Sequence, residues 1–456
     1  MAAIRPLRWD ASGKLMREFV SELVKAGDMV TVGRQVDPRF ELAAVTRAVQ
    51  KRGTQAVQFE NVAGSNMPVV SNLYGCHDRL TRLIGANGRP FTHRWAELMD
   101  APLPSGAATR DVPFPADRVS GSLSQLPQIT YHGLDAGPYI TSGIFIAKEP
   151  DTGVLNLSFH RSMFVSDREL RIRLGSSHDL YRYQAKAEAR GEAVEAAMMI
   201  GVAPEVFLAA CSSPPHGVSE LNMAAKISGK PVPMMPCRSI DMRVPASAEI
   251  VVEGRILPKV RRPEGPFGEF MGYYVPVGDN HIFEISDVHW RPQPLYHALV
   301  CGTPEDMRPL EAVTAARIYK HVSSVAPGVL DVSCRPNIMV TILKLRKQYE
   351  GHAQHVLLAA VGSHLDFNKV CIAVDEDVDI YNMEEVMWSF MTRGRADTRT
   401  TVIANMPGFY RDEHKDHWGR LLLDATAPFG READFHRKRV PGEDTIKLED
   451  YLKTVR

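Results

Sequence analysis

Residues 139–165 read YITSGIFIAKEPDTGVLNLSFHRSMFV, and this stretch decides how the middle of the chain folds. Two runs rich in β-branched and aromatic residues, 139–147 and 154–165, flank the polar segment KEPDTG. This pattern predicts a β-hairpin with a six-residue connection. Asn156 and Arg161 are an odd number of residues apart, so regular alternation would point them to opposite faces of the sheet. If both serve one site, the second strand must bulge or end near residues 158–160.

The flanking sequence predicts an α+β fold, with a strand-rich middle between two α/β regions. Apolar residues at helical spacing from Leu15 to Leu23, followed by Gly27, predict an opening helix. Pro309 suits the first turn of a linking helix at 309–325, because a proline N–H is not needed there. The other predicted elements are strands at 57–62, 67–75, 247–257, 281–290, 337–345, 355–363 and 370–380, and helices at 192–202, 218–229 and 384–393.

The composition is that of an ordinary globular protein of two or three domains. The 456 residues include 54 Lys+Arg and 54 Asp+Glu, so the net charge of zero argues against nucleic-acid binding through bulk positive charge. No run of about 18 apolar residues occurs, so no membrane-spanning helix is expected. The N-terminus lacks the apolar core of a secretory signal, and the six cysteines are scattered without a CxxC pair. These features predict a cytoplasmic protein with reduced thiols.

The segment PEGPFGE at 263–269 holds the first candidate chemistry. It places Glu264 and Glu269 five residues apart around Pro266 and two glycines, which exclude a regular helix. If the loop brings the carboxyl groups together, mutual repulsion and burial would keep one protonated as a general acid, and a nearby arginine would hold the other ionised. The competing interpretation is two exposed loop glutamates. Neither GxGxxG nor GxxxxGK[ST] occurs, so both standard phosphate loops are missing from the sequence.

Asn156, His178 and Glu220 form a second candidate group, drawn from a strand, a loop and a helix start. This mixed N/O set suits Mg²⁺ or Mn²⁺ better than Zn²⁺. Spacing alone does not single these residues out, because the chain has 16 histidines and Glu220 could be an ordinary first-turn residue.

Five segments taken together resemble the UbiD-type decarboxylases, which act reversibly on unsaturated and aromatic acids and use prenylated FMN. The segments are YHGLDAGPYITSGIFIAKEPDTGVLNLSFHR (131–161), SEL (219–221), SAEIVVEGRILPKVRRPEGPFGEFMGYY (247–274), EDVDIYNMEEVMWSFMTR (376–393) and LLLDAT (421–426). They occur in the family's order, and the resemblance runs from about residue 15 to residue 430.

The resemblance implies an N-terminal α/β cofactor domain with a split β-barrel (1–308), a linking helix (309–325) and a C-terminal α/β oligomerisation domain (326–456). Arg161, Glu264 and Glu269 match the family's catalytic Glu–Arg–Glu network, with Glu269 as proton donor. The implied metal ligands for Mn²⁺ or Mg²⁺ are Asn156, His178 and Glu220. The implied cofactor contacts are Asn156, Ser158, Phe159, Arg161, Ser177, His178, Glu220 and Arg420. A K⁺ site near residues 209–212 is also implied.

Two positions depart from the family pattern. Arg420 stands where a cofactor-contacting lysine is common, and an arginine can still bind phosphate in a bidentate manner. Ser177 stands where ferulic acid decarboxylases carry glutamine. This smaller side chain argues against a cinnamate substrate and slightly favours a heteroaromatic acid such as an indole-, pyrrole- or furan-carboxylate.

The implied function is reversible, non-oxidative decarboxylation of an aromatic, heteroaromatic or α,β-unsaturated acid. The implied partners are a flavin prenyltransferase that supplies the cofactor and a second copy of the chain, forming a homodimer or a higher multiple. Two alternatives stay open: a catalytically silent UbiD-like assembly subunit, and a cofactor-free divalent-metal hydrolase that uses Asn156, His178 and Glu220.

Overall fold

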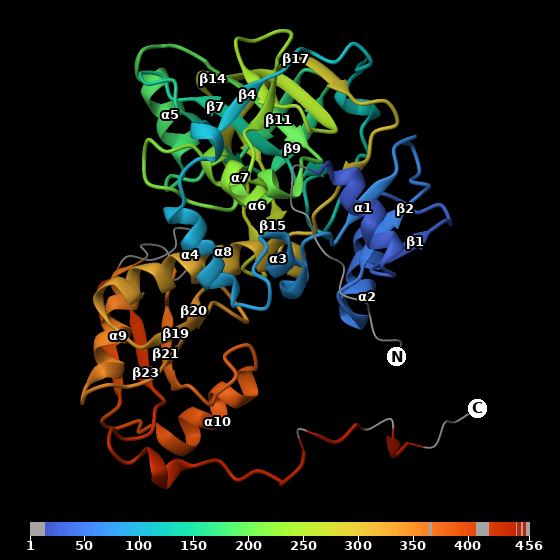
Figure 1. The fold of residues 1–456 in the computed structure, drawn as a ribbon. Coiled ribbons are helices and arrows are strands. Elements are labelled where there is room, and N and C mark those ends of the chain that lie inside the picture. The colour runs from blue at the N-terminus through green and yellow to red at the C-terminus, as the bar shows by residue number, and fades with distance from the viewer. Residues whose placement is uncertain (1–13, 364–366, 407–418, 444, 448–449, 453–456) are drawn as a thin grey trace.

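The fold has three parts joined through one long helix (Figure 1). A computed structural model describes residues 14–363, 367–406, 419–443, 445–447 and 450–452. An N-terminal α/β unit and a central, strand-rich unit form one end of the molecule, and a C-terminal α/β unit forms the other. Helix α8 (Pro304–Val325) lies between the two ends.

The N-terminal unit is a four-stranded sheet of order β1-β2-β3-β18 with helices packed around it. The predicted opening helix is confirmed, and its buried residues Phe19 and Leu23 face the core. The strands are β1 (Met29–Val32), β2 (Ala56–Phe59), β3 (Val69–Ser71) and β18 (Tyr296–His297), and the helices are α1 (Met16–Lys25), α2 (Glu41–Arg52), α3 (His77–Leu83) and α4 (Phe91–Asp100).

The central unit is built on one nine-stranded sheet of order β6-β9-β10-β17-β14-β11-β7-β8, with β5 paired to β17. The predicted hairpin is confirmed, because β7 and β8 pair antiparallel with Ile146 opposite Leu157. The strands are β5 (Val119–Ser120), β6 (Tyr139–Ile140), β7 (Ile144–Lys148), β8 (Leu155–Phe159), β9 (Ser162–Ser166), β10 (Glu169–Ile172), β11 (Val194–Ile200), β14 (Ile250–Glu264) and β17 (Gly278–Trp290).

This sheet is rolled upon itself. Strands β8 and β9 are six neighbours apart in the sheet order, which in a flat sheet corresponds to about 29 Å. Only His160 and Arg161 connect them, and three Cα–Cα steps reach at most about 11 Å. The two ends of the sheet must therefore approach each other, although no ladder joins β8 to β9 among the described strands. The strand also ends where the spacing of Asn156 and Arg161 predicts a break.

One prediction in this unit is wrong, because residues 192–202 form strand β11 and not a helix. The run EAVEAAMM contains good helix formers, but it lies between β7 and β14, with Met198 opposite both Phe145 and Val252. A central strand buried on both faces reads as an apolar run without alternation, so packing overrides local preference here.

Smaller elements surround the rolled sheet. Gly229 ends α7 in the left-handed conformation (φ 69°), as the sequence predicts. The helices are α5 (Asp179–Ala189), α6 (Pro204–Ala210) and α7 (Leu221–Ser228), with short 3₁₀ turns at Pro104–Gly106 and Leu123–Gln125; β4 (Thr109–Asp111), β12 (Val232–Pro236) and β13 (Arg243–Pro245) form one small sheet, and β15 (Phe267–Gly268) and β16 (Tyr274–Val275) form another.

The C-terminal unit is a three-layer α/β arrangement on a sheet of order β19-β20-β21-β23-β22. Residues 355–363 belong to helix α9 and not to the predicted strand. Its buried residues Val356, Leu357, Ala360 and Val361 repeat at helical spacing, and a short apolar run is ambiguous between the two structures. The elements are β19 (Val329–Ser333), β20 (Val340–Leu345), α9 (His352–Gly362), β21 (Val370–Asp375), α10 (Met383–Arg393), β22 (Thr400–Ile403), β23 (Arg420–Asp424) and a 3₁₀ turn at Glu432–Phe435.

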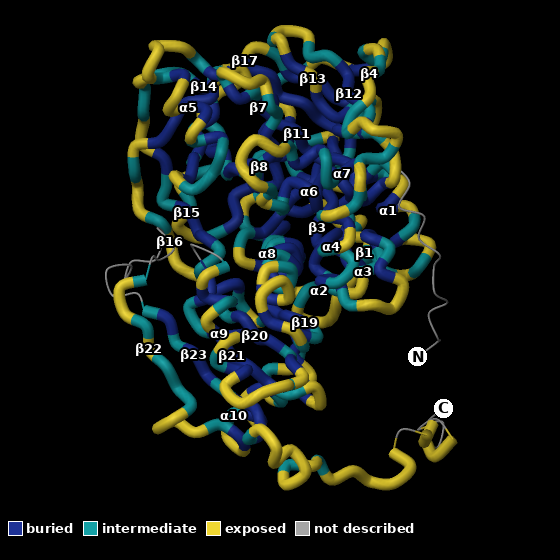
Figure 2. Tube along the Cα trace, turned by 60° about the vertical axis from the view of Figure 1, so that its left-hand side comes forward, coloured by how far each residue is buried: buried dark blue, intermediate teal, exposed yellow. Residues whose placement is uncertain are grey.

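Helix α8 fixes the N-terminal unit to the rest of the molecule. It begins at Pro304, earlier than the predicted Pro309, which lies inside its first two turns. The fully buried Glu305 carboxylate accepts hydrogen bonds from the backbone N–H of Leu73 (2.6 Å) and from His297 Nε2 (2.9 Å). Buried residues concentrate inside the sheets, whereas the described chain from Phe429 onward is mostly exposed (Figure 2).

A glycine-to-alanine exchange tests the register of β14 and β17. A methyl group on Gly254 would lie 2.1 Å from the Glu284 carbonyl oxygen of the adjacent strand. We expect Gly254→Ala to cost about 1–3 kcal/mol of unfolding free energy, because backbone must move to accept it. Gly53→Ala is the matched control, since nothing lies within 4 Å of its added methyl group. Equal denaturation midpoints for the two variants would contradict the assigned register.

Candidate active site

The loop after β14 folds back, so that two glutamates lie against one arginine. Glu264 is the last residue of β14, and Gly265 follows with φ +96°, a conformation that favours glycine. Gly268 then passes His132 so closely that a methyl group would lie 2.6 Å from its Nδ1 atom. The Glu269 N–H donates to the Tyr273 carbonyl (2.9 Å), which closes the turn.

Arg161 bridges the two carboxylates. Its Nε and one terminal nitrogen donate to Glu264 at 3.1 and 2.9 Å, and its other terminal nitrogen donates to Glu269 at 2.5 Å. The three side chains are between 0% and 8% exposed, and the Phe267 ring lies 4.9 Å from the guanidinium carbon. The interpretation of two exposed loop glutamates is therefore wrong, and both carboxylates meet Arg161 as the family resemblance implies.

The two carboxylates are held by different donors. Besides Arg161, Glu264 accepts hydrogen bonds from the Tyr139 hydroxyl (2.8 Å) and from Asn280 Nδ2 (2.8 Å), so both of its oxygens are occupied. Glu269 accepts from Arg161 through Oε2, and its Oε1 lies 3.5 Å from the backbone nitrogen of Phe270 and 3.8 Å from the Cys301 thiol. These two Oε1 contacts are long, whereas Glu264 is bound by four close donors and serves as a fixed acceptor.

We call Glu264, Arg161 and Glu269 the clamp, and its electrostatics keep the arginine charged. Burial lowers the pKa of Arg161, but the neighbouring Glu269 and Glu264 carboxylates outweigh burial and raise the pKa above its ordinary value. Burial also raises the pKa of Tyr139, and the Glu264 charge adds to that shift. Arg161 therefore stays charged, and Tyr139 stays a hydrogen-bond donor, across the physiological pH range.

Two members of the second predicted group, Asn156 and Glu220, come together. The Glu220 carboxylate, at the start of α7, accepts hydrogen bonds from Asn156 Nδ2 (3.0 Å) and from the Leu157 N–H (2.7 Å). Ser158 Oγ donates to Asn156 Oδ1 at 2.9 Å. His178 precedes α5, and its ring centroid lies 5.3 Å from that of His160, the residue that follows β8.

These side chains fit a divalent cation. Glu220 is 4% exposed, and among the described residues no lysine or arginine forms an ion pair with it. Burial raises the pKa of Glu220 to about 7, which shows that the carboxylate lacks a charge to compensate it. A carboxylate, an amide oxygen and an imidazole are ligands that Mn²⁺ and Mg²⁺ accept.

A different acidic cluster, Glu253, Asp287 and His289, has its ligand atoms close enough for a metal but is already satisfied. Arg118 donates to His289 Nδ1 (2.8 Å), so Nε2 carries the proton that is donated to Glu253 (3.0 Å). Arg238 pairs with Asp287 through two nitrogens, at 2.6 and 2.7 Å. With its imidazole nitrogens and carboxylates engaged, this cluster stabilises the β14–β17 pair and leaves Glu220 as the better metal candidate.

Hydrogen bonds connect the two candidate groups. His160 bonds to Ser158 Oγ through Nε2 (2.8 Å) and to the Arg173 carbonyl through Nδ1 (3.0 Å). Arg173 donates to Asn280 Oδ1 (3.2 Å), and Asn280 donates to Glu264. Asn280 and Tyr139 were missed by the sequence analysis, although both lie at ends of strands in the central sheet, where site residues gather.

The other predicted cofactor contacts and the predicted K⁺ site are spread over several elements. Ser177 is half-buried in the turn before α5, and Phe159 packs edge-to-face on Phe207 with centroids 5.0 Å apart. Residues 209–212 end helix α6. Arg420 is 1% exposed in β23 of the C-terminal sheet, and the hydrogen bonds of Asn156, Ser158 and Glu220 do not involve it.

Removal of the bridging cation tests the Arg161 clamp. Arg161→Gln leaves two buried carboxylates without their cation, and we expect it to cost about 3–5 kcal/mol of unfolding free energy at pH 7.5. The double variant Arg161→Gln/Glu269→Gln should recover part of this loss, because one charge is removed. Arg346→Gln is the control, since its ion pair with Glu376 is exposed and worth less than about 1 kcal/mol. An Arg161 variant as stable as the control would contradict the clamp.

Comparisons with known proteins agree on the family to which the chain is similar. The chain matches the family models of the 3-octaprenyl-4-hydroxybenzoate carboxy-lyase N-terminal domain (residues 20–99), Rift-related domain (108–304) and C-terminal domain (309–425). It is 32% identical to the anhydromevalonate phosphate decarboxylase of Methanothermobacter thermautotrophicus, over 92% of this chain and 99% of that protein.

Solved structures agree with the family models. The UbiD-class enzyme HmfF from Pelotomaculum thermopropionicum, in complex with FMN, has a TM-score of 0.91 and 32% identity, covering 96% of this chain and all of that one. The vanillic acid decarboxylase of Sedimentibacter hydroxybenzoicus in its open form has a TM-score of 0.83 and 26% identity, over 96% of this chain and 97% of that one. The chain therefore belongs to the UbiD family and is one of its decarboxylases.

Proposed function

We propose that this chain catalyses the reversible, non-oxidative decarboxylation of an aromatic or α,β-unsaturated acid with prenylated FMN as cofactor. The observation that carries the proposal is the buried Glu264–Arg161–Glu269 clamp, together with the Asn156–Glu220 pair whose side chains fit a divalent cation. A catalytically silent subunit has no need of a complete clamp. A metal hydrolase has no need of a second buried carboxylate pair held away from the metal ligands.

The chain's own residues would have separate roles in the proposed reaction. Bound prenylated FMN supplies the electron sink for the charge that develops as CO₂ leaves. Arg161 orients the substrate carboxylate while Glu264 holds the guanidinium in place through two hydrogen bonds. Glu269 would deliver a proton to the carbon from which CO₂ departs, and it would take up the next proton from solvent between turnovers. Burial of the clamp would keep bulk water away from the reacting carbon during the proton transfer.

The cofactor would be held without a phosphate loop. Asn156, His178 and Glu220 would bind Mn²⁺ or Mg²⁺, and the metal would neutralise the cofactor phosphate. Ser158, Phe159, Ser177 and Arg420 would add further contacts to the cofactor, and backbone carbonyls near 209–212 would bind K⁺. HmfF has been solved with both FMN and prFMN, which supports the flavin but neither metal ion.

The preference for a heteroaromatic acid has little support. It depends on Ser177, a half-buried residue for which the described structure records no side-chain hydrogen bond. Two relatives, from Methanothermobacter thermautotrophicus and Methanosarcina mazei, are named for a phosphorylated acid. An α,β-unsaturated acid is therefore as good a candidate as an aromatic one.

The C-terminal unit offers a surface for a second copy of the chain. Met391 on α10 and Val402 on the edge strand β22 are each 72% exposed, and Trp388 is 37% exposed. An evolved dimeric form of HmfF is among the similar structures. We propose a homodimer, or a multiple of one, built through this unit, with a flavin prenyltransferase as the metabolic supplier of cofactor.

Cofactor loading tests the proposed function directly. The chain should be co-expressed with a flavin prenyltransferase and purified in Mn²⁺ and K⁺. We expect visible absorbance and a bound species heavier than FMN by one prenyl unit, together with CO₂ release from at least one member of a panel of aromatic and acyclic unsaturated acids. A colourless protein that binds only metal would contradict the proposal and favour the hydrolase.

Substitution of one predicted metal ligand, compared with substitution of another buried glutamate, tests the metal site. Glu220→Gln removes the only carboxylate of the predicted ligand set, and we expect Mn²⁺ binding to weaken by at least about 100-fold, with loss of bound cofactor. Glu205→Gln is the control, because burial raises the pKa of Glu205 to about 7 as well, but this residue lies on α6. Metal content should be measured by elemental analysis after dialysis. Equal metal content in both variants would contradict the site.

A further inference from the structure

A turn at residues 300–303 leads into helix α8 and places a thiol beside Glu269. Gly302 has a φ of +73° in this turn, a conformation that favours glycine. An added methyl group on Gly302 would lie 3.3 Å from Phe270 Cα, so the turn packs directly against the residue that follows Glu269. The Cys301 Sγ atom lies 3.8 Å from Glu269 Oε1 as a result.

Asp306, in the first turn of α8, binds the same thiol. Its Oδ2 atom accepts a hydrogen bond from the Gly302 N–H at 2.7 Å, and its side chain forms a hydrogen bond with that of Cys301. One thiol therefore contacts two carboxyl groups, those of Glu269 and Asp306. Because a thiol carries one proton and its sulfur is a weak acceptor, it can donate to one carboxylate while it accepts from the other in its acid form.

The three side chains differ in their exposure to solvent. Glu269 is buried, whereas Cys301 and Asp306 are half-buried and Gly302, between them in the sequence, is exposed. The two contacts of the thiol thus connect the buried clamp with a residue that meets solvent. Such an order of contacts suits a path for protons between water and Glu269.

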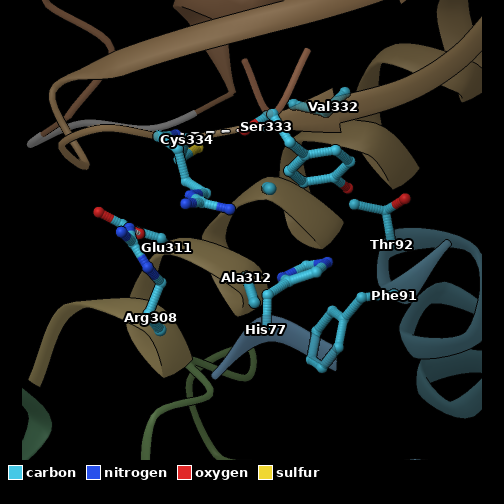
Figure 3. Close-up of a pocket in the computed structure, with 12 residues that line it drawn as sticks. His77, Phe91, Thr92, Arg308, Glu311, Ala312, Val332, Ser333 and Cys334 are labelled. Carbon is cyan, nitrogen blue, oxygen red and sulfur yellow. Dashed lines mark hydrogen bonds and ion pairs between the residues drawn. The ribbon is translucent and has the colours of Figure 1, made fainter. Parts of the chain in front are cut away.

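The charges around Asp306 favour a bound proton. Burial raises the pKa of Asp306 to about 6, and the Glu269 and Glu305 carboxylates raise it further, although its own hydrogen bonds act in the opposite direction. Arg308, the next basic residue along α8, donates to Glu311 Oε2 at 2.5 Å and is therefore engaged with another acid (Figure 3). An acid that served only as a helix cap would have its pKa lowered by the N–H that it accepts.

Asp306 can therefore change its charge near physiological pH, as a group that exchanges protons with solvent must. The titratable groups that face it from the neighbouring elements are Glu269 on the loop after β15, Cys301 on the turn, Cys211 at the end of α6, and Glu305 and Glu311 on α8 itself.

We propose that Cys301 and Asp306 form a proton relay that returns a proton to Glu269 after each turnover. Asp306 in its acid form gives its proton to the Cys301 sulfur while the thiol gives its own proton to Glu269 Oε1. One O–H bond breaks at Asp306, one S–H bond breaks and another forms at Cys301, and one O–H bond forms at Glu269. The Asp306 carboxylate then takes a proton from hydronium or a buffer acid. The inference rests on the proposed function, in which Glu269 is the proton donor, and contacts of this kind are commonly long until the complex with substrate forms.

Steady-state kinetics separate a relay from a structural role. Loaded wild type, Cys301→Val, Cys301→Ser and Asp306→Asn are assayed for CO₂ release from 2-furoate, cinnamate and 3-methylcrotonate. We expect Cys301→Val and Asp306→Asn to lower kcat by about 100-fold but to leave kcat/KM within about twofold, because the proton returns after CO₂ and product have left. Cys301→Ser should keep most of kcat, since a hydroxyl also donates and accepts. Imidazole added to Cys301→Val should restore kcat by delivering the proton directly.

Two control variants repeat the same chemical changes away from the clamp. Cys237→Val removes a thiol that also forms a hydrogen bond with a buried glutamate, Glu253. Glu41→Gln alters an acid at the start of α2 that accepts the Asp37 N–H at 2.8 Å. Both variants should keep the wild-type kcat. Equal losses of kcat and kcat/KM in Cys301→Val, or imidazole that restores no activity to it, would overturn the relay.

An infrared measurement tests the relay without turnover. The S–H stretching band of Cys301 in the unloaded chain is assigned by difference from Cys301→Val and is followed with pH. We expect the band to move with a midpoint near pH 6, because the thiol loses a charged acceptor when Asp306 takes a proton, and Asp306→Asn should remove this change. A band that does not respond to pH, or that responds equally in Asp306→Asn, would overturn the relay. If the band responds as expected but the loaded wild type releases CO₂ from none of the three acids, the proton path stands and the proposed function fails on these acids.

Discussion

The two-residue connection between β8 and β9 is the constraint on which the central unit depends. His160 and Arg161 alone link strands that stand six neighbours apart in the sheet, so the sheet must roll until its ends meet. The same connection interrupts the alternation of side chains. Asn156 therefore points to Glu220, while Arg161 points to Glu264 and Glu269. One short stretch of chain thus supplies both a predicted metal ligand and the arginine of the clamp.

The clamp then assigns different roles to two chemically identical side chains. Glu264 accepts four hydrogen bonds, including those from Tyr139 and Asn280, and has no capacity left for a proton donor's task. Glu269 accepts from Arg161 through Oε2 and has longer contacts through Oε1, on a loop that packs against the start of α8. Under the proposed function, Glu264 would hold Arg161 in place and Glu269 would exchange the proton, so that one buried ion pair serves catalysis as well as structure.

The sequence predicts the hairpin, the family and, if Asn156 and Arg161 serve one site, the strand break, because these depend on local turn residues and on ordered motifs. The residues themselves leave open whether Glu264 and Glu269 converge, and only the family resemblance implies that they do. The sequence-based prediction of secondary structure fails where tertiary packing determines whether a segment becomes a helix or a strand. Residues 192–202 have helix-forming composition but become the strand between β7 and β14, and the short apolar run at 355–363 reads equally as strand or helix. Asn280 lies outside the quoted motifs and Tyr139 lies inside one without a predicted role, so only the folded structure shows that both donate to Glu264. No helix in the described part of the chain is long and apolar enough to cross a membrane.

The most direct test of the account is hydrogen exchange into the decarboxylated product. Protein loaded with cofactor is incubated with product in D₂O, and deuterium at the carbon that would carry the carboxylate is measured by mass spectrometry for the wild type, Glu269→Gln and Glu264→Gln. We predict that Glu269→Gln retains cofactor and loses exchange, whereas Glu264→Gln still exchanges at a reduced rate, because it disturbs only the placement of Arg161. Exchange that survives in Glu269→Gln and disappears in Glu264→Gln would contradict the division of roles between the two glutamates.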